Sequence, residues 1–362
     1  MEKNELRIAF FGESGAGKTT LVSSYFGNLQ HNDFIDKNNY FIQADSISIG
    51  NKLLEKFYNI EAKTFPLGTD ESFEYKFNFK VKSLLNETPV QISWLDYPGK
   101  WWQTDPKDET EAIERKKAIY SLLQSHVGFI FIDSEKYIID GINYVKRLFN
   151  HFTNEIKRIQ SQINMGGETL VIEDFPKEWI IAFTKSDVLE EKNAKQISKK
   201  ILRNCLGEID ALGKQLNTDN IGHRLLLLSS VEAKDGMIIE PKNNFGLDLI
   251  APLAFESVIS RFKNAMGVPK TDIIIIQVIK GLKPIINLLD KLDDFLPKKY
   301  QVLTIILEAL RIKENLEKGE TFFADRAKGL EKKKKALESL LNRFKAQLAN
   351  ESNKRYFFQN QK

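Results

Sequence analysis

Apolar and polar positions alternate in a regular way along residues 5–268. Short apolar runs, typical of strands buried on both faces, occur at residues 6–11, 90–95, 127–132, 179–183 and 224–228. Helix-compatible segments lie between or after them, at residues 19–26, 108–124, 135–163, 191–216 and 247–266. Strands that alternate with helices at this spacing predict an α/β fold, with a mainly parallel sheet and helices on both of its faces.

Two segments depart from this alternation. Residues 73–81 alternate apolar and polar side chains with a period of two, which predicts a strand with one solvated face at the edge of the sheet. Residues 31–58 form a long polar connection in which 46–57 favour a short helix. Because long connections in compact domains tend to be functional or mobile, we interpret 31–58 as an insert in the α/β domain.

The alternation ends near residue 268. Apolar residues then recur at helical spacing within 272–296, 300–316 and 323–348. This predicts a first domain over residues 1–268 and a second region, 269–362, built as an α-helical hairpin or small bundle. The third helical segment carries a seam similar to a heptad repeat, which packs either within this region or against another chain.

Composition narrows the class of protein. The 362 residues are 42% hydrophobic and 28% charged with a net charge of +4, which is typical of a globular protein and gives no indication of a nucleic-acid partner. The single cysteine, Cys205, cannot form an internal disulfide. No apolar run reaches the roughly 18 residues that a membrane span needs. We therefore expect a cytoplasmic protein.

The first apolar run is followed directly by a glycine-rich loop. Its sequence, Gly-Glu-Ser-Gly-Ala-Gly-Lys-Thr-Thr, fills the pattern G-x-x-x-x-G-K-[ST] between a predicted strand and a predicted helix. Such a loop turns backbone N–H groups toward phosphate oxygens, while Lys18 adds a charge and the Thr19 hydroxyl is placed to ligate magnesium. The predicted phosphate-binding residues are Glu13, Ser14, Gly15, Ala16, Gly17, Lys18, Thr19 and Thr20.

A second patch, Asp-Tyr-Pro-Gly, ends the apolar run 90–95. Asp96 therefore lies at the C-terminal tip of a strand, where doubly wound sheets bind ligands. It is placed to anchor magnesium through water, and Gly99 can donate its backbone N–H to a γ-phosphate. An ordinary turn between a strand and a helix produces the same pattern, so its meaning comes from its position after the phosphate loop.

A third patch, Thr-Lys-Ser-Asp, ends the apolar run 179–183. Guanine presents its N1–H and its exocyclic amine side by side, so that one carboxylate can accept both hydrogen bonds, whereas adenine has no such donor pair. We assign base selection to Asp187 and the purine face to the stem of Lys185. The alternative is a solvated loop that caps the next helix. The predicted base-binding residues are Thr184, Lys185, Asp187, Ser229, Ser230 and Val231.

In this order the patches resemble those of the Ras-like P-loop GTPases of the translation-factor-related (TRAFAC) class, over residues 5–268. The resemblance implies a Ras-like G domain that binds GTP with Mg²⁺ and hydrolyses it to GDP and phosphate. It also implies that Lys18, Thr69 and Gly99 are catalytic and that Thr19, Thr69 and Asp96 hold the metal. Thr69 is the switch threonine because it stands just before the strand 73–81; Thr64 is the competing position.

The sequence departs from the family pattern at two positions. Thr184 stands where many members have Asn, a variation that preserves base recognition. Lys100 follows Gly99 where many small GTPases place the Gln that orients the attacking water. A charged lysine cannot accept a proton from water, so hydrolysis is expected to be slow or to use another group. Trp101 and Trp102 either shield the γ-phosphate, form a partner surface or anchor their loop in the core.

The resemblance leaves the partner open. A protein effector or a second copy of the chain could bind the switch loops or the C-terminal helices. Basic residues at 332–335 and 354–355 lie beside apolar ones and could touch acidic lipid, although a solvated helix face explains them as well. The main alternatives to a switch are a dynamin-like or septin-like GTPase that assembles on a membrane or into polymers, and a module that binds GTP without hydrolysing it.

Overall fold

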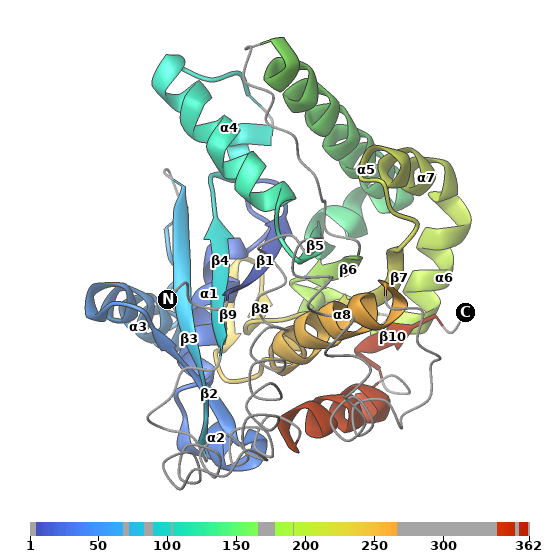
Figure 1. Ribbon diagram of the computed structural model, residues 1–362. Coiled ribbons are helices and arrows are strands. Elements are labelled where there is room, and N and C mark those ends of the chain that lie inside the picture. Colours follow the sequence, from blue (N-terminus) through green and yellow to red (C-terminus); the bar gives the residue numbers. More distant parts are fainter. Residues whose placement is uncertain are drawn as a thin grey trace, which may run out of the picture.

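In the computed structural model, the described residues are 5–67, 72–82, 90–102, 104–165, 178–190, 192–265, 339–351 and 355–360 (Figure 1). Thr69, the helices predicted at 272–296 and 300–316, and the basic run 332–335 lie outside these ranges. In the parts of the chain that are described, no helix is long and apolar enough to cross a membrane.

Eight strands of the described chain form one sheet, in the spatial order β10-β7-β6-β5-β1-β4-β3-β2. The five central strands pair in parallel, and β2, β3 and β10 are antiparallel to their neighbours. The strands are β1 (Glu5–Phe11), β2 (Tyr40–Ala44), β3 (Phe73–Val81), β4 (Val90–Asp96), β5 (Val127–Asp133), β6 (Trp179–Thr184), β7 (Ile221–Leu227) and β10 (Phe357–Gln359). The predicted mainly parallel sheet is confirmed.

Helices cover both faces of this sheet (Figure 1). One core joins α1 (Lys18–Asn28), α3 (Ile47–Glu61) and α8 (Ile250–Ala265) to the sheet. The other core joins α4 (Glu109–Leu123), α5 (Ser134–Met165), α6 (Ala194–Asn204) and α7 (Leu206–Gln215) to the opposite face. The apolar runs seen in the sequence therefore mark strands that are buried on both sides, as the full burial of β5 and β6 shows.

Three predicted elements need correction. The segment 73–81 is β3, but β2 lies outside it, so β3 is not the edge of the sheet. The stretch 31–58 contains α2 (Asn32–Asn38), β2 and most of α3, where Ser46 caps the helix by accepting a hydrogen bond from the Ile49 N–H. The helix predicted at 191–216 is two helices, α6 and α7, that break at Cys205.

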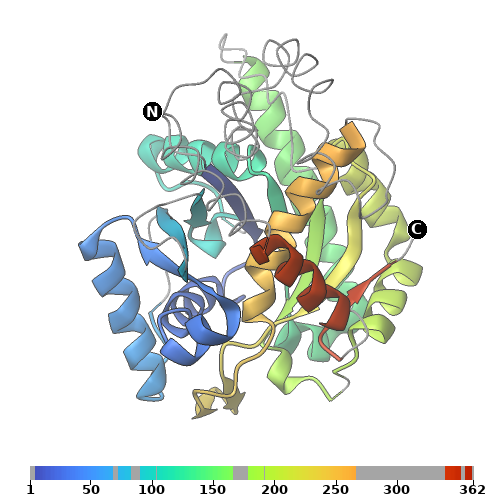
Figure 2. The same ribbon diagram turned by 60° about the horizontal axis from the view of Figure 1, so that its bottom comes forward.

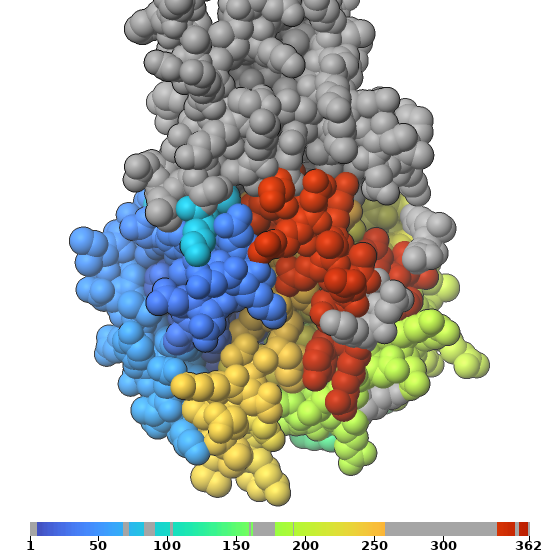
Figure 3. All heavy atoms as spheres, turned by 90° about the horizontal axis from the view of Figure 1, so that it is seen from below, coloured from blue at the N-terminus to red at the C-terminus, as the bar shows by residue number. Residues whose placement is uncertain are grey.

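The described end of the chain packs against the α/β core. Residues 339–351 are helical and cross α8, as Figure 2 shows in red and orange. Phe344 lies 5.3 Å from the ring of Tyr40 and 5.6 Å from that of Phe255. Leu341 and Leu348 are buried with it, so this part of the predicted apolar seam contacts the sheet-covering layer of its own chain. Figure 3 shows the same segments at the surface beside α8 and α2.

Candidate nucleotide-binding site

The phosphate loop, residues 12–17, joins β1 to α1 at the carboxyl end of the central strand. Gly15 and Gly17 have φ angles of 79° and 77°, which side chains with a Cβ disfavour. The Ala16 N–H donates to the Glu13 carbonyl oxygen at 3.2 Å and closes the turn. The glycines at these positions thus allow the positive φ angles with which the backbone turns here.

Lys18 is buried inside this loop. Its Nζ donates to the carbonyl oxygens of Gly12 at 2.7 Å and Glu13 at 3.2 Å. The ammonium also lies 4.8 Å from the centre of the Tyr97 ring, within cation–π range. Burial lowers the pKa of Lys18 to about 8, although the nearby Asp96 carboxylate opposes the shift. The side chain is therefore a desolvated cation whose present partners are neutral carbonyls that a phosphate could replace.

Thr19 and Asp96 meet beneath the loop. The Thr19 hydroxyl donates to Asp96 Oδ2 at 2.9 Å, and both side chains are buried. A hydroxyl and a carboxylate are hard oxygen donors, which suit Mg²⁺, and two protein oxygens leave positions for phosphate and water. The donor set present in the structure therefore fits the ion that the sequence predicts.

Tyr97 and Gly99 bring the second patch onto the phosphate loop. The Tyr97 hydroxyl accepts from the Gly12 N–H at 3.1 Å and donates to the Phe10 carbonyl at 2.9 Å. A Cβ placed on Gly99 would lie 2.3 Å from the Ser14 nitrogen, so the approach of the two backbones excludes any side chain. The sequence assigned no role to Tyr97, which locks the two patches together.

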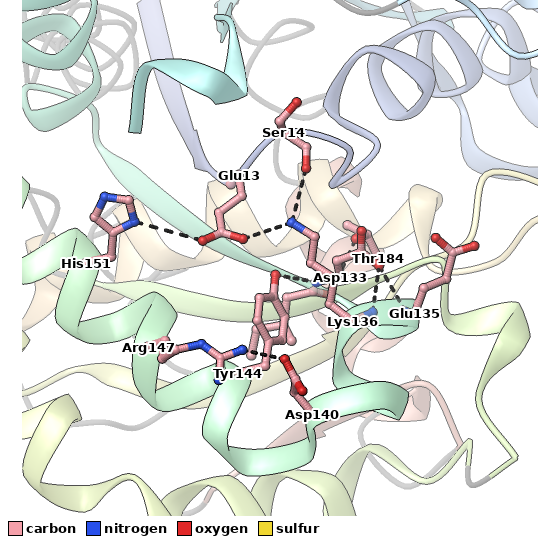
Figure 4. Close-up of polar contacts among 12 residues, drawn as sticks. Glu13, Ser14, Asp133, Glu135, Lys136, Asp140, Tyr144, Arg147, His151 and Thr184 are labelled. Carbon is pink, nitrogen blue, oxygen red and sulfur yellow. Dashed lines mark hydrogen bonds and ion pairs between the residues drawn. The ribbon is translucent and has the colours of Figure 1, made fainter. Parts of the chain in front are cut away.

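Glu13 points away from the loop toward α5, as Figure 4 shows. Its carboxylate accepts from Lys136 Nζ at 3.0 Å and lies 3.9 Å from His151 Nδ1. Lys136 Nζ also donates to the Ser14 carbonyl oxygen at 3.3 Å. The pairing with His151, then that with Lys136, holds the pKa of Glu13 at about 2 against the opposing effect of burial. This cluster fixes the outer side of the phosphate loop to α5.

Asp187 is anchored by groups from a later part of the chain. Its Oδ1 accepts from the Ser229 hydroxyl at 2.7 Å, and its Oδ2 accepts from the Ala233 N–H at 2.8 Å. Ala233 belongs to β8 (Glu232–Lys234), which pairs with β9 (Met237–Glu240) in a small hairpin. Because each carboxylate oxygen has two lone pairs, the carboxylate can be oriented by these donors and still accept from a ligand.

Lys185 reaches across to the end of β5. Its backbone is left-handed, with φ of 52°, and its Nζ donates to Asp133 Oδ2 at 2.9 Å and to Glu135. Burial alone would lower the pKa of Lys185, but the hydrogen bonds to Glu135 and Asp133 outweigh it and raise the pKa above its usual value. Lys185 is therefore a fixed cation beside the cavity.

These groups line one cavity of about 690 Å³. The predicted residues that line it are Ser14, Gly15, Ala16, Gly17, Lys18, Thr19, Thr20, Gly99, Thr184, Lys185, Asp187, Ser229, Ser230 and Val231. Phe65, Leu67 and Lys100 also face it, whereas Glu13 turns outward and Asp96 lies beneath Thr19. The cavity is large enough for a nucleotide.

The loop that follows Gly99 is anchored from within. Trp101 is buried in the same core as Tyr97 and Ile119, so of the roles that the sequence left open for it, the anchoring of its loop in the core fits the structure. The Arg115 guanidinium donates to the Trp101 carbonyl at 2.9 Å and lies 5.8 Å from the indole ring. The side chain of Trp102 lies outside the described residues.

Sequence reasoning missed Tyr97, Lys136, His151 and Ala233 as parts of this site. The partners of Glu13 lie more than a hundred residues away, so no local pattern connects them. The Tyr97 position was visible inside Asp-Tyr-Pro-Gly, but its hydroxyl partners depend on β4 lying next to β1.

Comparisons with known proteins identify no family for this chain. No protein-family model and no curated protein matches it. Among solved structures, translation elongation factor SelB from Methanococcus maripaludis in complex with the GTP analogue GppNHp is 15% identical with a TM-score of 0.30. Methanosarcina barkeri Roco2 RocCORdC bound to GDP is 13% identical with a TM-score of 0.28. Each match covers 72% of this chain, but 35% of the first and 50% of the second. Likeness of this degree defines no function, so the functional case stands on the side chains described above.

Proposed function

We propose that the protein binds GTP with Mg²⁺, hydrolyses it slowly to GDP and phosphate, and acts as a nucleotide-dependent switch for a protein partner in the cytoplasm. One observation carries the proposal. A single cavity is lined at once by the phosphate loop with Lys18 and by Asp187, a carboxylate that two donors hold in place. Phosphate and base recognition are thereby available to one ligand.

On the phosphate side, the roles follow from charge and geometry. Lys18 exchanges its carbonyl partners for phosphate oxygens, which repay the cost of burying its charge. The Gly99 backbone lies against Ser14 of the phosphate loop, and its N–H would donate to a γ-phosphate. Thr19 and Asp96 would hold Mg²⁺. When bound, that ion neutralises charge on the β- and γ-phosphates.

On the base side, Asp187 selects guanine. The Ser229 hydroxyl and the Ala233 N–H set the plane of its carboxylate, leaving lone pairs for the N1–H and the exocyclic amine of guanine. Adenine offers no donor pair of this kind. Its binding would displace water from the Asp187 carboxylate without giving hydrogen bonds in return, which costs binding free energy. We therefore expect strong discrimination against ATP.

The switch character comes from two segments beside the phosphate end of the cavity. Phe65 and Leu67 line it although they are 40% and 89% exposed. Their loop, together with Thr69, and the loop 96–107 would order around a γ-phosphate and relax after hydrolysis. A partner protein would bind these exposed apolar residues in one arrangement of the loops and not in the other.

Lys100 favours a second candidate function, a module that holds GTP without hydrolysing it. Lys100 lines the cavity directly after Gly99, where it adds positive charge but no proton acceptor for water. Such a module would keep one GTP per chain and release no phosphate over hours.

Single-turnover hydrolysis of GTP in Mg²⁺ separates the two candidates and tests the role of Lys100. The wild type should release phosphate slowly, and Lys100→Gln should raise the rate about tenfold or more because an amide can orient water. Lys100→Arg, which keeps the charge, is the matched control and should give no gain. Phosphate release as fast in the wild type as in Lys100→Gln would contradict the role of Lys100, and no bound GTP at all would remove the proposed function.

A further inference from the structure

The last described residues of the chain, 355–360, lie against the elements that carry the base side of the cavity. We call them the C-terminal brace. Its strand β10 pairs antiparallel with β7, with Phe357 opposite Leu226. The Tyr356 carbonyl accepts from the Leu227 N–H at 2.8 Å, and the Asn360 N–H donates to the His223 carbonyl at 2.8 Å. β7 leads directly into Ser229–Val231, so the brace forms the outer neighbour of the strand that delivers this loop.

The brace also contacts the helix that follows Asp187. The Ala194 N–H, the first of α6, donates to the Arg355 carbonyl oxygen at 2.9 Å. The first N–H groups of a helix have no partner within the helix, so this carbonyl satisfies one of them. The helix that follows the segment of Asp187 and the strand that precedes the segment of Ser229 are therefore bonded to the same six residues.

A ring contact connects the brace to the base carboxylate. Tyr356 stacks on Phe245 with ring centres 4.3 Å apart and planes 18° apart. Phe245 exchanges two backbone hydrogen bonds with Ser229, at 3.0 and 3.1 Å. Ser229 in turn donates its hydroxyl to Asp187 Oδ1. Each step in this series is a direct contact.

We propose that the C-terminal brace is part of the guanine-recognition site, in which Tyr356 acts as a positioning residue for Asp187 through Phe245 and Ser229. This inference rests on the proposed function. Because β10 is a short edge strand, its docking is a local equilibrium that can shift without global unfolding. If docking of the brace raises the affinity for GTP, bound GTP must in turn stabilise the docked brace, since coupling between two sites is reciprocal. A partner that pulls on the C-terminal region would thereby lower guanine affinity.

The affinity ratio of GTP to inosine triphosphate tests this positioning. Inosine triphosphate keeps the N1–H but lacks the exocyclic amine, so it loses one of the two hydrogen bonds to Asp187. The wild-type ratio should be roughly tenfold to a hundredfold. Tyr356→Ala should lower the ratio at least about threefold, because a tilted carboxylate no longer accepts both donors. Tyr356→Phe keeps the ring and should keep the ratio.

Tyr120→Ala is the matched control. It removes a ring of the same size that packs partly buried against the same core, but from α4, outside the C-terminal brace and the cavity. It should lower the melting temperature without changing the ratio, since general destabilisation affects both nucleotides equally. A Tyr356→Ala ratio within twofold of wild type, with both nucleotides still binding, would overturn the inference. A wild type that prefers neither GTP nor its guanine analogues over ATP would remove the proposed function together with it.

Hydrogen exchange on the wild type keeps the test independent of whether Tyr356→Ala folds. Saturating GTP should slow exchange at the Leu227 amide, which donates to Tyr356 of the brace, and at the Asn360 amide, which donates from the brace to His223, by at least about threefold. The Lys82 amide, bonded to the Asn39 carbonyl at the other edge of the sheet, is the internal reference. Unchanged exchange at Leu227 and Asn360 under saturating GTP would contradict the coupling.

Discussion

On the phosphate side of the cavity, residues 10–19 contact residues 96–99 because β1 and β4 are adjacent parallel strands, and the Tyr97 and Thr19 hydroxyls form hydrogen bonds between the two segments. On the base side, Asp187 depends on Ser229 and Ala233, and behind these on Phe245 and the last residues of the chain. The phosphate side is thus built mainly from two short segments, with α5 fixing the outer side of the loop, and the base side from segments spread between residues 187 and 356.

This difference has a physical consequence. The phosphate loop and Asp96 lie at the ends of central strands that are largely buried, so their positions are held by the core. The base side lies next to an edge strand of three residues and a two-stranded hairpin, elements that open at low cost. We expect nucleotide affinity to be set mainly on the phosphate side and base selectivity, with its regulation, mainly on the base side.

The largest effect should come from the phosphate side. Lys18→Ala removes the buried cation that faces the phosphates and should weaken GTP and ATP alike, by at least about a hundredfold, which corresponds to about 3 kcal/mol. Titration with both nucleotides measures it, and circular dichroism checks the fold. A loss confined to GTP would break the division between the two sides.

A smaller effect, limited to selectivity, should come from the base side. Asp187→Asn replaces one acceptor by an amide donor, so GTP binding should weaken by roughly tenfold to a hundredfold while xanthosine triphosphate, with a carbonyl in place of the amine, binds better. Inorganic tripolyphosphate serves as the control ligand, and its affinity should stay unchanged. Equal losses for GTP and tripolyphosphate would assign Asp187 a structural role instead.

The smallest effect is a pH dependence that isolates Lys18. Burial lowers its pKa to about 8 in the free protein, whereas bound phosphate raises it, so binding takes up a proton above pH 8. GTP affinity should be independent of this group below pH 8 and fall by up to about tenfold per pH unit above it. Lys18→Arg, which stays charged, should lack this slope. Parallel slopes in the two proteins would contradict the assignment.

The lowered pKa of Lys18 gives folding stability a pH dependence opposite to that of GTP affinity. Between pH 8 and 10.5 the unfolded chain holds the Lys18 proton more tightly than the native protein does. Stability of the nucleotide-free protein should therefore gain a contribution as pH rises through this window. As pH rises, GTP affinity would fall while the stability of the nucleotide-free protein rises. Opposite changes of this kind are expected if one buried lysine, Lys18, causes both.

The parallel strands of the core and the glycine-rich loop could be predicted from the sequence for one reason. The strands there are uniformly apolar runs, and the loop carries its chemistry within nine consecutive residues, so local pattern and tertiary structure agree. The Thr-Lys-Ser-Asp patch is equally local, although the donors that orient Asp187 are not.

The elements that were missed are those defined by their partners. β10 has three residues, and Phe357 is a strand residue because the edge of β7 is available to it. β2 and the β8–β9 hairpin are similarly short and solvated on one side. The break between α6 and α7 falls at Cys205, two residues before Gly207, and no proline marks it, so the end of the first helix has only a weak signal in the sequence.

A competition titration of the purified protein with GTP and ATP in Mg²⁺ tests the central claim most directly. An oriented Asp187 predicts that GTP binds at least about a hundredfold more tightly than ATP, with one nucleotide per chain. Equal or tighter binding of ATP would contradict guanine recognition by Asp187 and would favour a P-loop protein that uses ATP instead.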